Sequence, residues 1–83
     1  MFMMIQTDPA LTLNIKGLNC PMPLTWAKNQ LDLLKPGEIL EILATDPSTV
    51  SNFQAFARST GHELVEWTEE DGVFRLFVKK RAP

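Results

Sequence analysis

The sequence contains one cysteine, Cys20, one histidine, His62, and no tyrosine. A single cysteine cannot form a disulfide within the chain, so nothing points to an oxidising compartment, and we expect the thiol to be kept reduced in the cytoplasm. One cysteine and one histidine also fall short of a typical tetrahedral zinc site unless several chains share the metal. We therefore expect neither a metal nor a bound cofactor.

Basic residues are few: 8 lysines and arginines stand against 10 aspartates and glutamates, for a formal net charge of −2. Proteins that grip nucleic acid need a basic stripe, and the only basic run, Lys79-Lys80-Arg81, is explained by a solvated chain end. No run of about 18 apolar residues is present. The apolar start Met1–Ile5 is too short for a secretory signal. We expect no direct nucleic-acid binding and no membrane segment.

The chain has the length of a single domain. We place this domain at residues 11–80, after an N-terminal arm of residues 1–10 and before a tail of residues 81–83. Residues 11–16 alternate between apolar and polar, which is typical of a strand with one buried face. From Pro21 the spacing becomes helical, and Lys35-Pro36-Gly37 ends that helix. Its inward stripe consists of Leu24, Ala27, Leu31 and Leu34.

The second half of the domain opens with the apolar run 38–44, which predicts a central strand. Asp46 then supplies an N-cap acceptor and Pro47 a residue suited to the first helical position, while Gly61 caps the end of this second helix. Residues 63–68 and 73–79 alternate on either side of the turn signal Glu70-Asp71-Gly72, so they predict a hairpin.

The predicted order is therefore β-α-β-α-β-β. It indicates an α/β (α+β) two-layer sandwich, in which a mixed four-stranded sheet carries both helices on one face. A helix that follows a strand starts at the carboxyl edge of that strand. The segments Cys20–Pro23 and Asp46–Thr49 thus share one edge of the sheet, the edge at which open α/β sheets favour binding sites.

The lone thiol lies in the stretch GLNCPMP, at the predicted start of the first helix. The positive end of the helix dipole favours a thiolate there. Pro21 and Pro23 are tolerated in a first helical turn, because their missing N–H groups would have no intrahelical partner, and they hold the thiol on a stiff mount. A buried, inert cysteine is the alternative, but the polar junction favours an exposed, reactive one.

Two absences narrow the chemistry of Cys20. His62 is expected at the opposite sheet edge, roughly 17–20 Å away along a strand, as a surface residue, so a cysteine-histidine dyad is not expected. No second cysteine can resolve an adduct on Cys20, so any adduct must pass to another molecule, as in a carrier. Lys28 either helps to attract an anionic sulfur species or is a solvated surface lysine.

A second candidate surface is apolar. With the core stripe turned inward, a helical wheel places Met22, Trp26 and Leu33 together on another face, where they form a candidate docking patch. The alternative is that Trp26 folds onto the sheet or is covered by the N-terminal arm. If the patch were the working surface and the thiol incidental, the protein would be a non-catalytic interaction or regulatory module.

Several segments together carry a family resemblance. The run Gly17-Leu18-x-Cys20-Pro21-x-Pro23 resembles the signature of the TusA/SirA family of sulfur-carrier proteins. Further blocks agree in order over residues 11–80: Lys35-Pro36-Gly37-Glu38, Ala44-Thr45-Asp46-Pro47, Gly61-His62-Glu63-Leu64 and the closing strand from Asp71 to Lys80. The resemblance implies a sandwich like the C-terminal domain of translation initiation factor three.

The resemblance also implies a function. Cys20 would accept sulfur as a transient persulfide from a cysteine desulfurase or a rhodanese-like donor and relay it to a DsrE-type acceptor protein. The relay would serve 2-thiouridine synthesis in tRNA or cytoplasmic sulfur trafficking during sulfur oxidation. This is sulfurtransferase-type chemistry, whether or not the carrier itself counts as an enzyme, and it requires only a monomer or transient complexes.

Carried over by position, Cys20 is the persulfide site and Pro21 and Pro23 are its scaffold. Lys28 is the basic helix residue, and Asp46 is the neighbour at the start of the second helix. The sequence departs from several relatives at Met22, where they carry an acidic residue, and at Trp26. These departures leave the chemistry intact and leave the choice of partner open.

Overall fold

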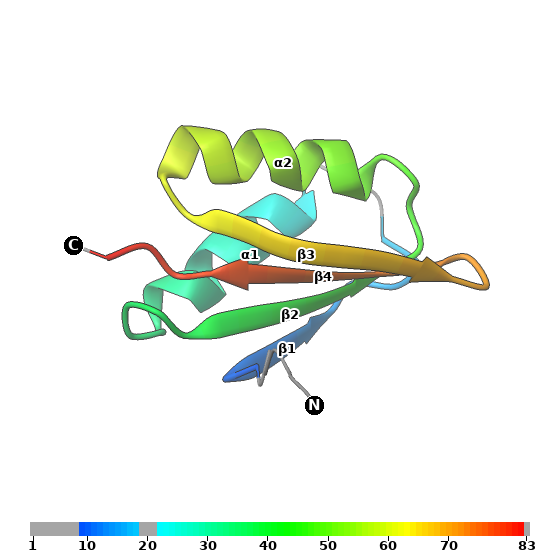
Figure 1. The fold of residues 1–83 in the computed structure, drawn as a ribbon. Coiled ribbons are helices and arrows are strands. Elements are labelled where there is room, and N and C mark those ends of the chain that lie inside the picture. The colour runs from blue at the N-terminus through cyan, green and yellow to red at the C-terminus, as the bar shows by residue number, and fades with distance from the viewer. Residues whose placement is uncertain (1–8, 19–21, 83) are drawn as a thin grey trace, which may run out of the picture.

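The computed structural model of the protein describes residues 9–18 and 22–82. Its six elements follow one another as predicted. They are β1 (Leu11–Asn14), α1 (Met22–Asp32), β2 (Ile39–Ala44), α2 (Thr49–Thr60), β3 (Glu63–Glu70) and β4 (Val73–Lys79). The strands form one sheet in the order β1-β2-β4-β3 (Figure 1). β1 pairs parallel to β2, and β4 runs antiparallel to both of its neighbours, which confirms the mixed four-stranded sheet.

Both helices pack on one face of the sheet, as the sequence predicts (Figure 1). In β2 and β4 every second residue faces the helices, because side chains alternate along a strand. The fully buried side chains of this layer are Leu40, Ile42, Ala44, Leu76 and Val78. Ala27 and Leu31 from α1 and Phe53 from α2 complete the core from above, each without exposed area. The result is a two-layer sandwich with a single core.

Helix α1 buries the stripe that its spacing predicts. Ala27 and Leu31 are fully buried, Leu34 is buried just beyond the helix end, and Leu24 is partly buried against the core. The end of the helix is held from a distance, because Lys80 Nζ donates to the Leu31 carbonyl oxygen at 2.7 Å. A cation at a helix C-terminus is stabilising, since it meets the free carbonyls and the negative end of the dipole.

The predicted start of α2 is wrong by two residues. Asp46 does not cap the helix, and Pro47 is not its first residue. Instead, the Asp46 carboxylate accepts hydrogen bonds from the Ser48 N–H (3.0 Å) and hydroxyl (2.9 Å), and its carbonyl accepts one from the Thr49 N–H (3.0 Å). Aspartate readily bonds the backbone two residues on in this way, which forms a turn before the helix. The predicted cap at Gly61 is confirmed, with a φ of 83° and its N–H bonded to the Ala57 oxygen.

The hairpin is confirmed, but its first strand is less regular than predicted. Asp71 and Gly72 both have positive φ, 54° and 81°, which is typical of a two-residue type I′ turn. In β3, however, the pairing with β4 shifts between Leu64 and Glu66, so Val65 is an extra, bulged residue. The bulge breaks the predicted alternation, and most of this edge strand is exposed.

Candidate functional site

The structure contains the sheet edge at which the sequence predicts the functional site. Asn14 pairs with Leu43, and the last residue of β2, Ala44, pairs with Phe74, so β1 and β2 end side by side. The hairpin tip that follows Glu70 returns to the same edge. α1 and α2 both begin there, each after the strand that precedes it (Figure 1). In the sequence, Cys20 stands between the end of β1 and the start of α1.

The chain on both sides of that segment is anchored. Before it, the Ile15 N–H donates to the Leu43 oxygen at 2.8 Å, and the Gly17 N–H donates to Thr45 Oγ1 at 2.9 Å. Gly17 has a φ of 85°, which suits glycine. After the segment, Met22 is the first residue of α1. Gly17 comes three residues before Cys20 in the sequence, and Met22 comes two residues after it.

Cys20 and Pro21 themselves lie outside the described residues, so their roles as persulfide site and scaffold stay predictions. Pro23 lies in the first turn of α1, as predicted. Thr45 holds the chain before Cys20 in place through its hydrogen bond to Gly17. The sequence did not predict this role, because the bond joins positions far apart in the chain. The signal that could have found it is its place in the block Ala44-Thr45-Asp46-Pro47.

The two polar residues predicted to support the thiol are placed differently. Asp46 lies at the predicted edge, partly buried, with its carboxylate bonded to Ser48. Lys28 forms an ion pair with Asp32 at 3.4 Å, and both side chains are more than half exposed. Such an exposed pair contributes little. The observed contact of Lys28 matches the solvated-lysine interpretation, and its role toward sulfur stays a prediction.

The predicted docking patch is apolar and open at its described residues. Trp26 is 42% exposed and Leu33 is 74% exposed. Trp26 lies on α1 and Leu33 directly after its end, and neither belongs to the buried core stripe. Trp26 therefore does not fold under onto the sheet. The side chain of Met22 and the N-terminal arm of residues 1–8 lie outside the described part of the chain. The patch as described consists of Trp26 and Leu33.

His62 lies at the sheet edge opposite to the one at which α1 and α2 begin. It precedes β3, whose first residue Glu63 pairs with Lys79 beside the start of β2. The ring is more engaged than the predicted surface residue, because it stacks on Phe56 at 6.1 Å and Nδ1 accepts the Arg81 N–H at 3.1 Å. Partial burial, together with the charges of Lys80 and Arg81, lowers the pKa of His62, and Asp32 opposes this weakly. His62 is thus a structural residue that holds the C-terminal tail through Arg81.

We expect this histidine to make stability pH-dependent. Because its pKa is lower in the folded protein than the ordinary value of about 6.5, its neutral form stabilises the fold above that pH, and this contribution is lost as the pH falls through the folded pKa. Urea unfolding at pH 8, 7, 6 and 5 measures the loss. His62→Gln retains an acceptor but does not titrate, so its stability should fall less between pH 7 and 5. Equal losses would contradict the assignment.

Within residues 9–18 and 22–82, no three histidine, cysteine, aspartate or glutamate side chains gather in a way that could hold a metal ion. No helix in this same part of the chain is long and apolar enough to cross a membrane.

The fold is similar to the crystal structure of a SirA-like protein from Desulfitobacterium hafniense, with a TM-score of 0.75 and 27% sequence identity, over 87% of this chain and 99% of that one. The protein is thus of the class of small α+β sandwiches that includes this SirA-like protein, which confirms the predicted fold.

Sequence comparison defines the family. The family described as "Sulfurtransferase TusA" matches residues 11–80. The chain is 47% identical over 68 residues to the sulfur carrier protein TusA of Allochromatium vinosum, covering 82% of this chain and 90% of that protein. It is 44% identical over 70 residues to a putative sulfur carrier protein of Neisseria meningitidis, covering 84% of this chain and 95% of that protein. The chain belongs to the TusA family, which confirms the resemblance.

Proposed function

We propose that the protein is a sulfur carrier that holds a sulfur atom as a persulfide on Cys20 and relays it between two other proteins. The observation that supports this most is the family match over residues 11–80, which contains Cys20 between its two anchored flanks. Cys20 is the only thiol of the chain. The relatives with 47% and 43% identity are both named sulfur carrier proteins.

The proposed reaction is a sulfur exchange that needs no oxidant. The Cys20 thiolate attacks the outer sulfur of a donor persulfide, and the S–S bond of the donor breaks as the new S–S bond forms. The donor leaves as a thiolate, and Cys20 holds the S–SH group. An acceptor thiolate then attacks that outer sulfur and releases the Cys20 thiolate. The carrier needs no base or resolving cysteine of its own.

The proposed donors are a cysteine desulfurase or a rhodanese-like protein, and the proposed acceptor is a DsrE-type protein. The relay would end in 2-thiouridine of tRNA or in cytoplasmic sulfur oxidation. These partners follow from the resemblance of the GLNCPMP segment and its accompanying blocks. The change to Met22 and the exposed Trp26 bear on which partner binds.

The mass of the intact protein tests the proposal. Reduced protein is incubated with a cysteine desulfurase and cysteine, or with a rhodanese and thiosulfate, and its mass is then measured. A carrier gains the mass of one sulfur atom, and dithiothreitol removes it. Omission of the donor enzyme is the control. No gain with either donor would overturn the proposal for these two donor classes.

We expect Cys20 to be a more acidic thiol than an ordinary cysteine. In the sequence it comes two residues before Met22, the first residue of α1, and the positive end of a helix dipole favours a thiolate. Its rate of alkylation by iodoacetamide should therefore rise with pH about a midpoint below 8.5, approximately the ordinary pKa of cysteine. Cysteine in a short peptide of residues 17–24 is the control, since it has the same neighbours without the fold. A midpoint that matches the peptide would contradict activation by the helix.

The exposure of Trp26 favours a partner-binding surface on α1. Both candidate functions need such a surface: the sulfur carrier, and the alternative of a non-catalytic interaction module. Trp26→Ala should lower kcat/KM for sulfur loading by about 30-fold, since a tryptophan at the centre of an interface contributes about 2 kcal/mol or more. Trp26→Phe should retain most of the rate, and Asn29→Ala, at an exposed neighbouring position, should retain all of it. If partners bind equally well to protein that never gains sulfur, the interaction module is favoured.

A further inference from the structure

β3 is one of the two edge strands of the sheet, with β1 at the other edge. In the described part of the chain it pairs with β4 on one side and with no strand on the other (Figure 1). It is also the longest strand, with 8 residues. An unpaired edge of this length exposes backbone N–H and C=O groups that can hydrogen-bond to another chain.

The hairpin geometry indicates which backbone groups are free. A two-residue type I′ turn is flanked by a pair that exchanges both backbone hydrogen bonds, here Glu70 and Val73. Bonded and non-bonded pairs alternate along an antiparallel ladder. The backbone groups of Thr68 and Glu70 therefore face β4, whereas those of Trp67 and Glu69 face the free edge.

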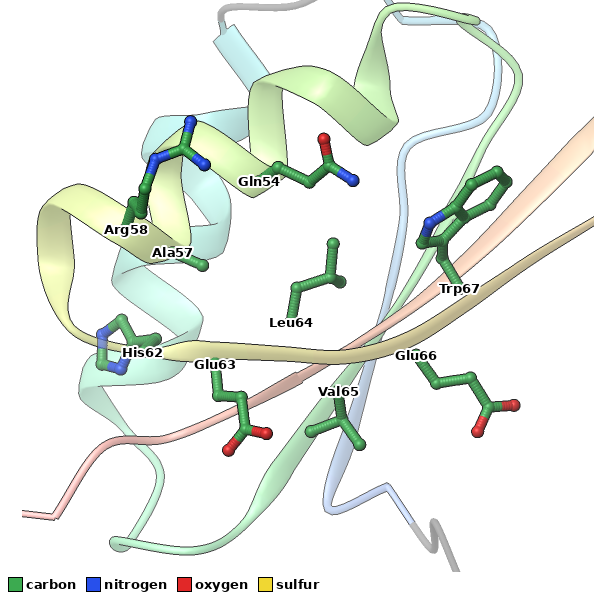
Figure 2. A pocket seen from close by; sticks show the side chains of 9 residues that line it. All are labelled: Gln54, Ala57, Arg58, His62, Glu63, Leu64, Val65, Glu66 and Trp67. Atoms are coloured by element: carbon green, nitrogen blue, oxygen red, sulfur yellow. The ribbon is translucent and has the colours of Figure 1, made fainter.

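A groove runs beside this edge, between β3 and α2 (Figure 2). On its helix side lie Leu64 and Trp67, which both point toward α2, while Val65 and Glu66 point to the opposite side of the sheet. The bulge places these last two side chains on the same side. Trp67 is 43% exposed. An added strand could therefore place an apolar side chain against Trp67.

The charges of β3 select what can pair with it. Its acidic residues Glu63, Glu66, Glu69 and Glu70 are all exposed. None of these four glutamates forms an ion pair within residues 9–18 and 22–82. Lys79 lies opposite Glu63 in β4, whereas Glu66, Glu69 and Glu70 lie opposite Phe77, Phe74 and Val73. A second copy of the strand would place glutamates beside glutamates, which is destabilising. The edge therefore disfavours self-pairing, and its charge complements a basic strand.

We propose that β3 accepts, as a fifth strand, an extended segment of a partner protein in which apolar residues alternate with lysine or arginine. The apolar side chains lie on the helix side, against Trp67. The basic side chains lie on the open face of the sheet, toward Glu66 and Glu70, which share that face because their partners in β4 are Phe77 and Val73. Strand addition of this kind takes its affinity from the backbone and its selectivity from alternate side chains. The proposal stands apart from the sulfur chemistry of Cys20.

Hydrogen exchange followed by NMR tests the proposal on the full chain. The probe is the acetylated heptapeptide Lys-Val-Lys-Ile-Lys-Val-Lys. Its binding should slow the exchange of the Trp67 and Glu69 amides, which face the free edge, and should leave the already paired Thr68 and Glu70 amides unchanged. A peptide of the same composition with the lysines in one block, and one with glutamate in place of lysine, should slow neither.

Two variants separate strand addition from general attraction of charge. Glu66→Lys should weaken binding of the alternating peptide by about ten-fold, or 1.4 kcal/mol, whereas Asp32→Lys on α1, with the same change in net charge, should not. Glu69→Pro removes the N–H that faces the free edge and should abolish the slowing at Trp67. Equal binding of the block peptide, equal effects of the two lysine variants, or unchanged Trp67 and Glu69 exchange at saturating peptide would each overturn the proposal.

Discussion

Cys20→Ser should abolish the gain of sulfur completely. The chain has no other cysteine, and a serine hydroxyl is not a nucleophile toward a persulfide at neutral pH, because it stays protonated without a base beside it. The expected result is an unchanged intact mass after incubation with desulfurase and cysteine, or with rhodanese and thiosulfate, under conditions in which the wild type gains one sulfur atom.

The control for this variant is a measurement of its folding stability. Both flanks of the segment are held by groups other than the thiol, through the Gly17–Thr45 hydrogen bond and the first turn of α1. Cys20→Ser should therefore unfold at the same urea concentration as the wild type. Sulfur gained by folded Cys20→Ser protein would show that Cys20 is not the carrier residue. Loss of sulfur together with loss of folding would call for the same measurement on Cys20→Ala.

The fold could be predicted from the sequence wherever one physical cause dominated. The stripe from Leu24 to Leu34 repeats at the helical period; Ala27, Leu31 and Leu34 are buried, and Leu24 is partly buried. The apolar run 38–44 lies in the middle of the sheet, as β2. Glycine at positive φ marked the end of α2 and the hairpin turn, since other residues adopt that conformation at a cost. In each case local pattern and final packing agree.

Prediction failed where two local structures compete for the same residues. Aspartate before proline can cap a helix or close a turn that precedes it, and only the structure shows that Asp46 does the latter. The bulge at Val65 has no signal in the sequence, because it depends on how β3 matches β4. The contact between His62 and Arg81 joins positions 19 residues apart, which no local pattern can reveal.

In the candidate site, too, local patterns could be predicted from the sequence and long-range contacts could not. Topology alone predicted the edge that the starts of α1 and α2 share with the hairpin tip, since each follows from the direction of a strand. The hydrogen bond from Gly17 to Thr45 joins two different loops. Strand direction alone does not predict a contact of this kind. Periodicity predicted that Trp26 and Leu33 face away from the core, because a surface position on a helix is set by its angle to the buried stripe.

The largest effect on stability is expected for Phe53→Ala. Phe53 lies in α2 without exposed area and packs edge-to-face on Phe56, with ring centroids 5.6 Å apart. Truncation of such a side chain costs about 3–5 kcal/mol, from lost burial and the cavity left behind. At about 0.05–0.15 kcal/mol per residue, a domain of this length has a total stability of the same order. Urea unfolding should show a much lower midpoint, or no folded baseline.

Phe53→Leu is the matched control, since it fills most of the volume and should cost about 1 kcal/mol. A loss below about 1.5 kcal/mol for Phe53→Ala would show that the core closes over the cavity. The variant also separates two causes of lost sulfur gain. Phe53→Ala acts through the fold, so a ligand or osmolyte that restores folding should restore sulfur gain as well. Cys20→Ser protein should be folded without any addition, and no such addition can restore a missing sulfur nucleophile.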